Sequence, residues 1–90
     1  MLNIVYTKSY NKRAAAFLKK HPDLTGQYKK TLRLLETNPG HPALNLHKLK
    51  GKKKELYSVS INVKFRLTLY FIIREYKIIL VQVGSHNEVY

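Results

Sequence analysis

The 90-residue chain contains no cysteine and no tryptophan. Without cysteine it can form neither a disulfide framework nor a thiolate zinc site, and it has no cysteine nucleophile. Acidic residues are also scarce. The five Asp and Glu residues are scattered along the chain, and they form no pair spaced for metal binding or for two-carboxylate catalysis. The longest apolar run, residues 69–73, is far too short to cross a bilayer.

Positive charge is abundant, since 17 Lys and Arg residues outnumber the five acids and give a formal net charge of +12. A small domain this basic repels itself, which indicates an anionic partner: nucleic acid first, a membrane surface second. The hydrophobic content of 44% is enough for a modest core. We expect one domain over residues 1–90, no secretory signal, no membrane association and a cytoplasmic location.

Two kinds of hydrophobic periodicity divide the chain. The first half repeats apolar residues at helical spacing after a short strand, and the second half alternates them with a period of two. The predicted elements are a strand at 2–6, helices from Thr7 or Ser9 to His21 and over 23–38, a loop at 39–54, and strands near 55–61, 65–73 and 78–83. This order predicts an α+β fold with a two-helix hairpin packed on one face of a four-stranded, mainly antiparallel sheet.

The second face of that sheet is predicted to be polar. The residues that alternate with the apolar set are Ser58, Ser60, Arg66, Thr68, Tyr70 and Gln82. A lysine-rich loop, with five lysines over residues 48–54, leads into the sheet, and the segment 84–90 leaves it after the last strand. A polar sheet face is often simply solvated. The basic loop and the tail could nevertheless meet around one surface.

Metal-free RNA cleavage needs a base, an acid and cations that stabilise the charge on the phosphate. His86 follows the last strand and could transfer a proton, and Arg66 could clamp a phosphate. An ordinary surface histidine and a solvent-facing arginine are the alternatives for these two residues. The candidate phosphate contacts are His47, Lys48, Lys50, Lys52, Lys53 and Lys54; a basic cluster of this kind is more often a solvated face.

Three stretches of the sequence resemble the RelE/ParE superfamily of bacterial and archaeal toxins. Residues 46–51, Leu-His-Lys-Leu-Lys-Gly, are similar to the basic loop before the family's second strand. Residues 57–70 are similar to its central hairpin. Residues 83–90, Val-Gly-Ser-His-Asn-Glu-Val-Tyr, are similar to its ending and carry the most specific likeness.

The resemblance implies a RelE/YafQ-like mRNA interferase: the toxin of a type II toxin–antitoxin system, which enters the ribosomal 30S A site. Such an enzyme cuts mRNA by 2′-hydroxyl attack, without metal or cofactor, and a cognate antitoxin blocks it. By the same resemblance His86, Arg66 and Tyr90 are catalytic, with His86 or Tyr90 as the base, and Lys48 and Lys50 match the basic loop. Two alternatives stay open: a ParE-like inhibitor of DNA gyrase, and a non-catalytic basic RNA-binding module.

Overall fold

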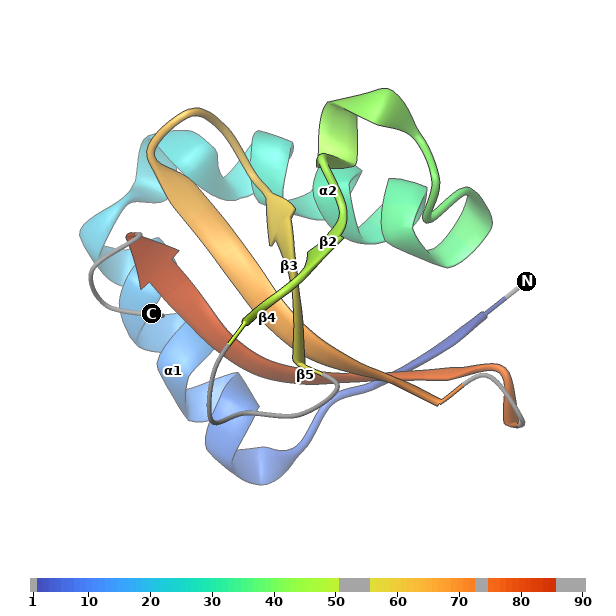
Figure 1. The fold of residues 1–90 in the computed structure, drawn as a ribbon. Helices are drawn as coiled ribbons and strands as arrows, with labels where there is room; N and C mark the ends of the chain where they lie inside the picture. The colour runs from blue at the N-terminus through green and yellow to red at the C-terminus, as the bar shows by residue number, and fades with distance from the viewer. Residues whose placement is uncertain (1, 51–55, 73–74, 86–90) are drawn as a thin grey trace.

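The computed structural model describes residues 2–50, 56–72 and 75–85. Figure 1 shows the path of the chain. In chain order the elements are β1 (Asn3–Val5), α1 (Lys8–Lys20), the 3₁₀ turn η1 (Pro22–Leu24), α2 (Thr25–Thr37), the 3₁₀ turn η2 (Pro42–Leu44), β2 (His47–Lys48), β3 (Leu56–Ser60), β4 (Phe65–Ile72) and β5 (Lys77–Ser85).

The boundaries of α1 follow from its capping residues. The Thr7 side chain accepts a hydrogen bond from the backbone N–H of Tyr10 at 3.1 Å, which satisfies one of the free donors of the first turn. At the other end His21 precedes Pro22, and its backbone leaves the helical region. The expected helix from Thr7 to His21 is therefore confirmed. The second helix begins slightly later than predicted, because η1 occupies Pro22–Leu24 first.

The sheet has five strands in the order β1-β5-β4-β3-β2, and not the four that the sequence predicted. Its pairs are antiparallel except for the parallel contact between β1 and β5. The additional strand is β2, which pairs His47 with Ser58 inside the segment predicted as a loop. This strand forms because its backbone pairs with β3. A lysine-rich sequence has no local preference for strand that would have predicted it.

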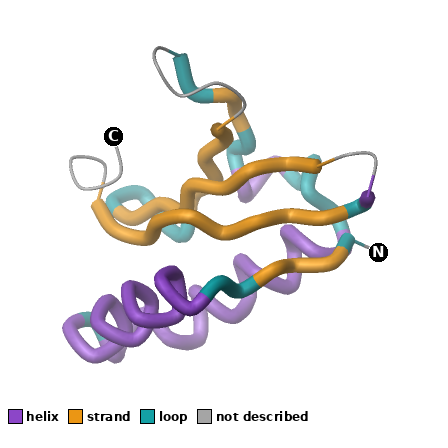
Figure 2. The backbone as a smooth tube through the Cα atoms, turned by 90° about the horizontal axis from the view of Figure 1, so that it is seen from below, coloured by secondary structure: helices purple, strands orange, loops and turns teal. Residues whose placement is uncertain are grey.

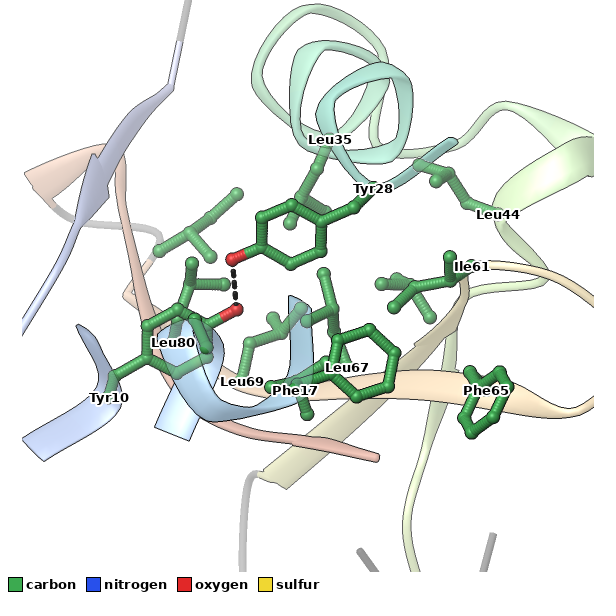
Figure 3. Packing of buried hydrophobic residues seen from close by; sticks show 14 residues of the cluster. Tyr10, Phe17, Tyr28, Leu35, Leu44, Ile61, Phe65, Leu67, Leu69 and Leu80 are labelled. Atoms are coloured by element: carbon green, nitrogen blue, oxygen red, sulfur yellow. Dashed lines mark hydrogen bonds between the residues drawn. The ribbon is translucent and has the colours of Figure 1, made fainter. Parts of the chain in front are cut away.

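The two long helices cover one face of the sheet, and Figure 2 shows both of them on the same side of it. The core lies between these layers (Figure 3). Within it the hydroxyl groups of Tyr10 in α1 and Tyr28 in α2 are 2.6 Å apart and form a buried hydrogen bond. This bond joins the two helices through their apolar sides, because each tyrosine is surrounded by core residues.

The opposite face of the sheet, called the open face below, is not uniformly polar. One row across β3, β4, β5 and β1 is apolar apart from the tyrosine hydroxyl and contains Leu56, Tyr70, Ile79 and Val5. A second row, across β2 to β5, is polar and contains His47, Ser58, Thr68 and Gln82. The predicted polar face is therefore confined to the half of the sheet that carries the second row.

Two residues predicted to lie on a polar surface are instead buried. Ser58 is 0% exposed and Thr68 is 1% exposed. Both belong to interior strands, where neighbouring strands flank a short side chain on either side. No helix within the described residues is long and apolar enough to cross a membrane.

Candidate functional site

Arg66 lies on the open face with its side chain held by a neighbouring strand. It lies in the interior strand β4, and its ladder partner on β3 is Ser60. One terminal nitrogen of its guanidinium donates a hydrogen bond to the Ser60 hydroxyl at 3.0 Å. The side chain is half-buried, and its Nε is a buried nitrogen without a hydrogen-bond partner among the described residues. An unsatisfied buried donor costs about 1–3 kcal/mol, so this nitrogen is suited to an incoming acceptor.

The other neighbour of Arg66 is Gly84 on β5. Glycine adds no side chain beside the guanidinium, and a glycine within a strand often marks a close approach by a ligand. A guanidinium stays charged at every working pH and fits two phosphate oxygens with its planar donors. Ser60 holds this group in place without neutralising it. The geometry therefore suits Arg66 to bind a phosphate on the open face.

His47 and Lys48 form the edge strand β2, and both side chains are exposed. Residues paired in a ladder lie on the same face of the sheet. His47 pairs with Ser58 and so shares the open face with Arg66, whereas Lys48 pairs with Tyr57, whose side chain packs toward the core. The backbone N–H of Leu49 donates to Leu56 and continues this ladder beyond β2. Edge position and exposure leave both basic groups accessible to a ligand.

The remaining predicted site residues are distributed unevenly. Lys50 is exposed just after β2. Five of the predicted residues lie outside the described part of the chain: Lys52, Lys53, Lys54, His86 and Tyr90. Their roles stay predictions. Within the described residues no group of three or more His, Asp or Glu side chains could hold a metal ion.

A second basic cluster was not singled out from the sequence as a site. Where α1 packs against β5, a pocket of about 280 Å³ is lined by Arg13, Lys20, His21 and Gln82, among others. One terminal nitrogen of Arg13 donates to the side-chain oxygen of Gln82. Gln82 is distant in sequence from the three basic residues, and His21 was predicted only as the end of the first helix. The sequence of a basic helix does not indicate which strand packs beside it, so this pocket could not be predicted from the sequence.

Several solved structures with this fold are described as toxins or toxin–antitoxin complexes. A metal-bound toxin from Helicobacter pylori matches with a TM-score of 0.81 and 28% identity over 100% of both chains. A chain of the Escherichia coli DinJ–YafQ toxin–antitoxin complex matches with a TM-score of 0.79 and 21% identity, over 99% of this chain and 97% of that one. A chain of the YoeB–YefM complex from Staphylococcus aureus matches with 0.72 and 20% identity, over 96% and 98%. No family model and no curated protein sequence matches the chain.

These matches confirm the resemblance at the level of the fold, because the chain shares the fold of the YafQ and YoeB toxins along essentially its whole length. They also confirm the α+β class with two helices on one face of a sheet. At 20–21% identity the likeness to the YafQ and YoeB complexes is one of fold. The likeness to the Helicobacter pylori toxin is somewhat closer in sequence, at 28%.

Proposed function

We propose that this chain is the toxin of a type II toxin–antitoxin system, and that it cleaves mRNA on the ribosome without a metal ion. The observation that carries the proposal is Arg66: a guanidinium oriented by Ser60, with a buried Nε that has no partner among the described residues. Two of the similar structures are complexes of a toxin with its antitoxin, DinJ–YafQ and YoeB–YefM. They support a cognate antitoxin as partner.

In the proposed reaction the 2′-hydroxyl of the RNA attacks the adjacent phosphorus, and the 5′-oxygen of the next nucleotide leaves. Arg66 binds the two non-bridging oxygens and stabilises the charge that develops on them. His86 and Tyr90 are the proposed proton-transfer groups. One of them takes the proton from the 2′-hydroxyl, and the other protonates the leaving 5′-oxygen or stacks on a nucleobase. His47 on the open face and the lysines that follow it supply phosphate attraction along the RNA.

The direct test is substitution of Arg66. Arg66→Ala removes a charge-assisted contact from a partly dry site, so cleavage should fall by about 10²–10³-fold. Arg66→Lys should restore only part of the activity, because an ammonium group lacks the planar pair of donors. Arg33→Ala is the matched control, since it removes one exposed cation from α2, on the other side of the sheet. Primer extension on mRNA from a translating extract measures the cuts.

Two controls separate this function from its alternatives. Cleavage of the same mRNA should be lost when ribosomes are omitted, which tests ribosome dependence. If Arg66→Ala cuts as well as the unchanged chain, Arg66 is an ordinary strand residue and the proposal is wrong. If the chain leaves mRNA intact and blocks DNA supercoiling by gyrase, it acts as a ParE-like inhibitor instead.

A further inference from the structure

The pocket between α1 and β5 has the chemistry of an anion site. Its charged lining is basic: Arg13 and Lys20 come from α1, and His21 caps the end of that helix. A water molecule occupies about 30 Å³ in the liquid, so a pocket of about 280 Å³ has room for a phosphate group with part of its hydration shell. Among the residues that the structure describes, no acidic side chain lines it.

The positive charge of the pocket is not neutralised within the described chain. The one ion pair in residues 2–50, 56–72 and 75–85 joins Lys77 to Glu75 at 3.1 Å, and neither of these residues lines the pocket. The C-terminal end of α1 contributes about half a negative charge through the helix dipole. The two full charges of Arg13 and Lys20 outweigh it. The described residues therefore give the pocket a net positive charge.

The lining groups are also held in place. Arg13 is anchored by its hydrogen bond to the Gln82 side chain, which leaves the other guanidinium donors available. The ring of His21 packs against two phenylalanines, with ring centroids 5.0 Å from Phe17 and 4.6 Å from Phe65. A fixed imidazole presents an N–H donor at a defined position, which lowers the entropy lost when a ligand binds.

The pocket lies beside β5, the strand that pairs with β4 at Arg66. Gln82 lies two residues before Gly84, the ladder partner of Arg66. One strand spacing of about 4.8 Å and two residues of about 3.4 Å each place the Arg66 and Gln82 positions about 8 Å apart. Gln82 also ends the polar row that starts at His47, and it lies beyond the last residue of β5 that β1 covers, Ile79. A strand of RNA on the open face can therefore leave it over this edge.

We propose that the α1–β5 pocket binds a backbone phosphate of the same RNA strand whose scissile phosphate lies at Arg66. The inference rests on the function proposed above and adds a second phosphate subsite outside the reacting centre. An acidic peptide offers similar charge. RNA is favoured because Gln82, which lines the pocket, lies two residues from the ladder partner of Arg66 on β5, so one chain of phosphates can reach both sites around this edge of the sheet.

The test compares two double variants of α1 that remove the same charge. Arg13→Ala with Lys20→Ala empties the pocket of its full charges, and Lys12→Ala with Lys19→Ala removes two cations that do not line it. All four side chains are exposed, so neither pair disturbs the core. The probe is a fluorescent single-stranded dodecanucleotide with 2′-O-methyl groups, which cannot be cleaved. Its anisotropy is measured with the full chain at several salt concentrations.

The pocket variant should bind this RNA about tenfold more weakly, the effect of losing one charge-assisted contact of about 1.4 kcal/mol. The slope of log K against log salt should become shallower by about 0.7, the value for one phosphate contact on a single strand. The control variant should change the affinity much less. Equal losses in both variants, or no loss in either, would overturn the subsite.

A second probe separates this inference from the proposed function. A trinucleotide long enough only for the Arg66 site should bind the pocket variant normally and bind Arg66→Ala weakly. If Arg66→Ala cleaves mRNA normally while the pocket variant still loses affinity for the dodecanucleotide, the cleavage mechanism fails and the phosphate subsite stands. If the pocket variant binds RNA normally but loses binding to a polyglutamate peptide, the pocket serves an acidic protein segment and the RNA inference is wrong.

Discussion

The hydrogen bond between Tyr10 and Tyr28 should couple the two helices measurably. Tyr10 is 0% exposed and Tyr28 is 6% exposed, so a hydroxyl left alone by either substitution cannot readily reach water. A buried group without its partner costs about 1–3 kcal/mol. We expect Tyr28→Phe, which orphans the fully buried Tyr10 hydroxyl, to lower the free energy of unfolding by about 2 kcal/mol, and Tyr10→Phe by about 1 kcal/mol.

The double variant Tyr10→Phe with Tyr28→Phe removes both hydroxyls and leaves no orphan. Its loss should therefore be about 1 kcal/mol smaller than the sum of the single losses. Urea unfolding followed by circular dichroism measures all four corners of this cycle. Tyr76→Phe makes the same chemical change at a side chain that is 68% exposed, and should alter stability by less than about 0.5 kcal/mol. Strictly additive single losses would refute the coupling.

The same pair gives stability a defined dependence on alkaline pH. Burial, followed by the bond to Tyr28, raises the pKa of Tyr10 above its ordinary value of 10.0, and burial also raises the pKa of Tyr28. A raised folded-state pKa contributes stability that is complete below the unfolded pKa and is lost above it. Above about pH 10, each tyrosine should therefore lower the free energy of unfolding by about 1.4 kcal/mol per pH unit. The double phenylalanine variant should lose this component, and an unchanged slope would contradict the account.

Three further predictions concern the proposed nuclease. His86→Ala should lower mRNA cleavage by about 10²–10⁴-fold while leaving ribosome binding nearly intact, and a loss below tenfold would assign the base to Tyr90. Lys48→Ala with Lys50→Ala should weaken RNA binding and reduce its salt dependence; an unchanged salt slope, measured by anisotropy titration, would place both lysines outside the interface. The purified chain should still cut mRNA in the translating extract after it has been dialysed against a chelator, as checked by primer extension, and a loss restored by reloading the chain with metal would contradict the metal-free mechanism.

The periodicity of the sequence was sufficient to locate the long elements. Apolar residues repeat at helical spacing from Tyr10 to Leu18 and with a period of two from Phe65 to Phe71. Both patterns are local, so they can be read without knowing how the elements pack together. Caps and breakers such as Thr7 and Pro22 act within a few residues, so the ends of α1 were predictable too. The placement of Arg66 on the face opposite the helices followed from the same alternation.

Pairing and burial depended on contacts between distant residues. The strand β2 exists because His47 and Lys48 meet β3, and Ser58 and Thr68 are buried because interior strands flank them. The sequence contains no local signal for either outcome, since a short polar side chain is equally compatible with a surface and with the middle of a sheet. The bond that orients Arg66 likewise required the register that sets Ser60 opposite it.

Composition alone determined that this protein is basic, small and free of cysteine chemistry, and its last residues carried the most specific likeness to the toxins whose fold it shares. Tertiary structure alone brought Arg13 and Lys20 beside Gln82, which lies 69 residues beyond Arg13 in the chain. Charge is a property of each residue and can be counted from the sequence. A binding site is a property of distances, and packing of α1 against the edge of β5 sets those distances.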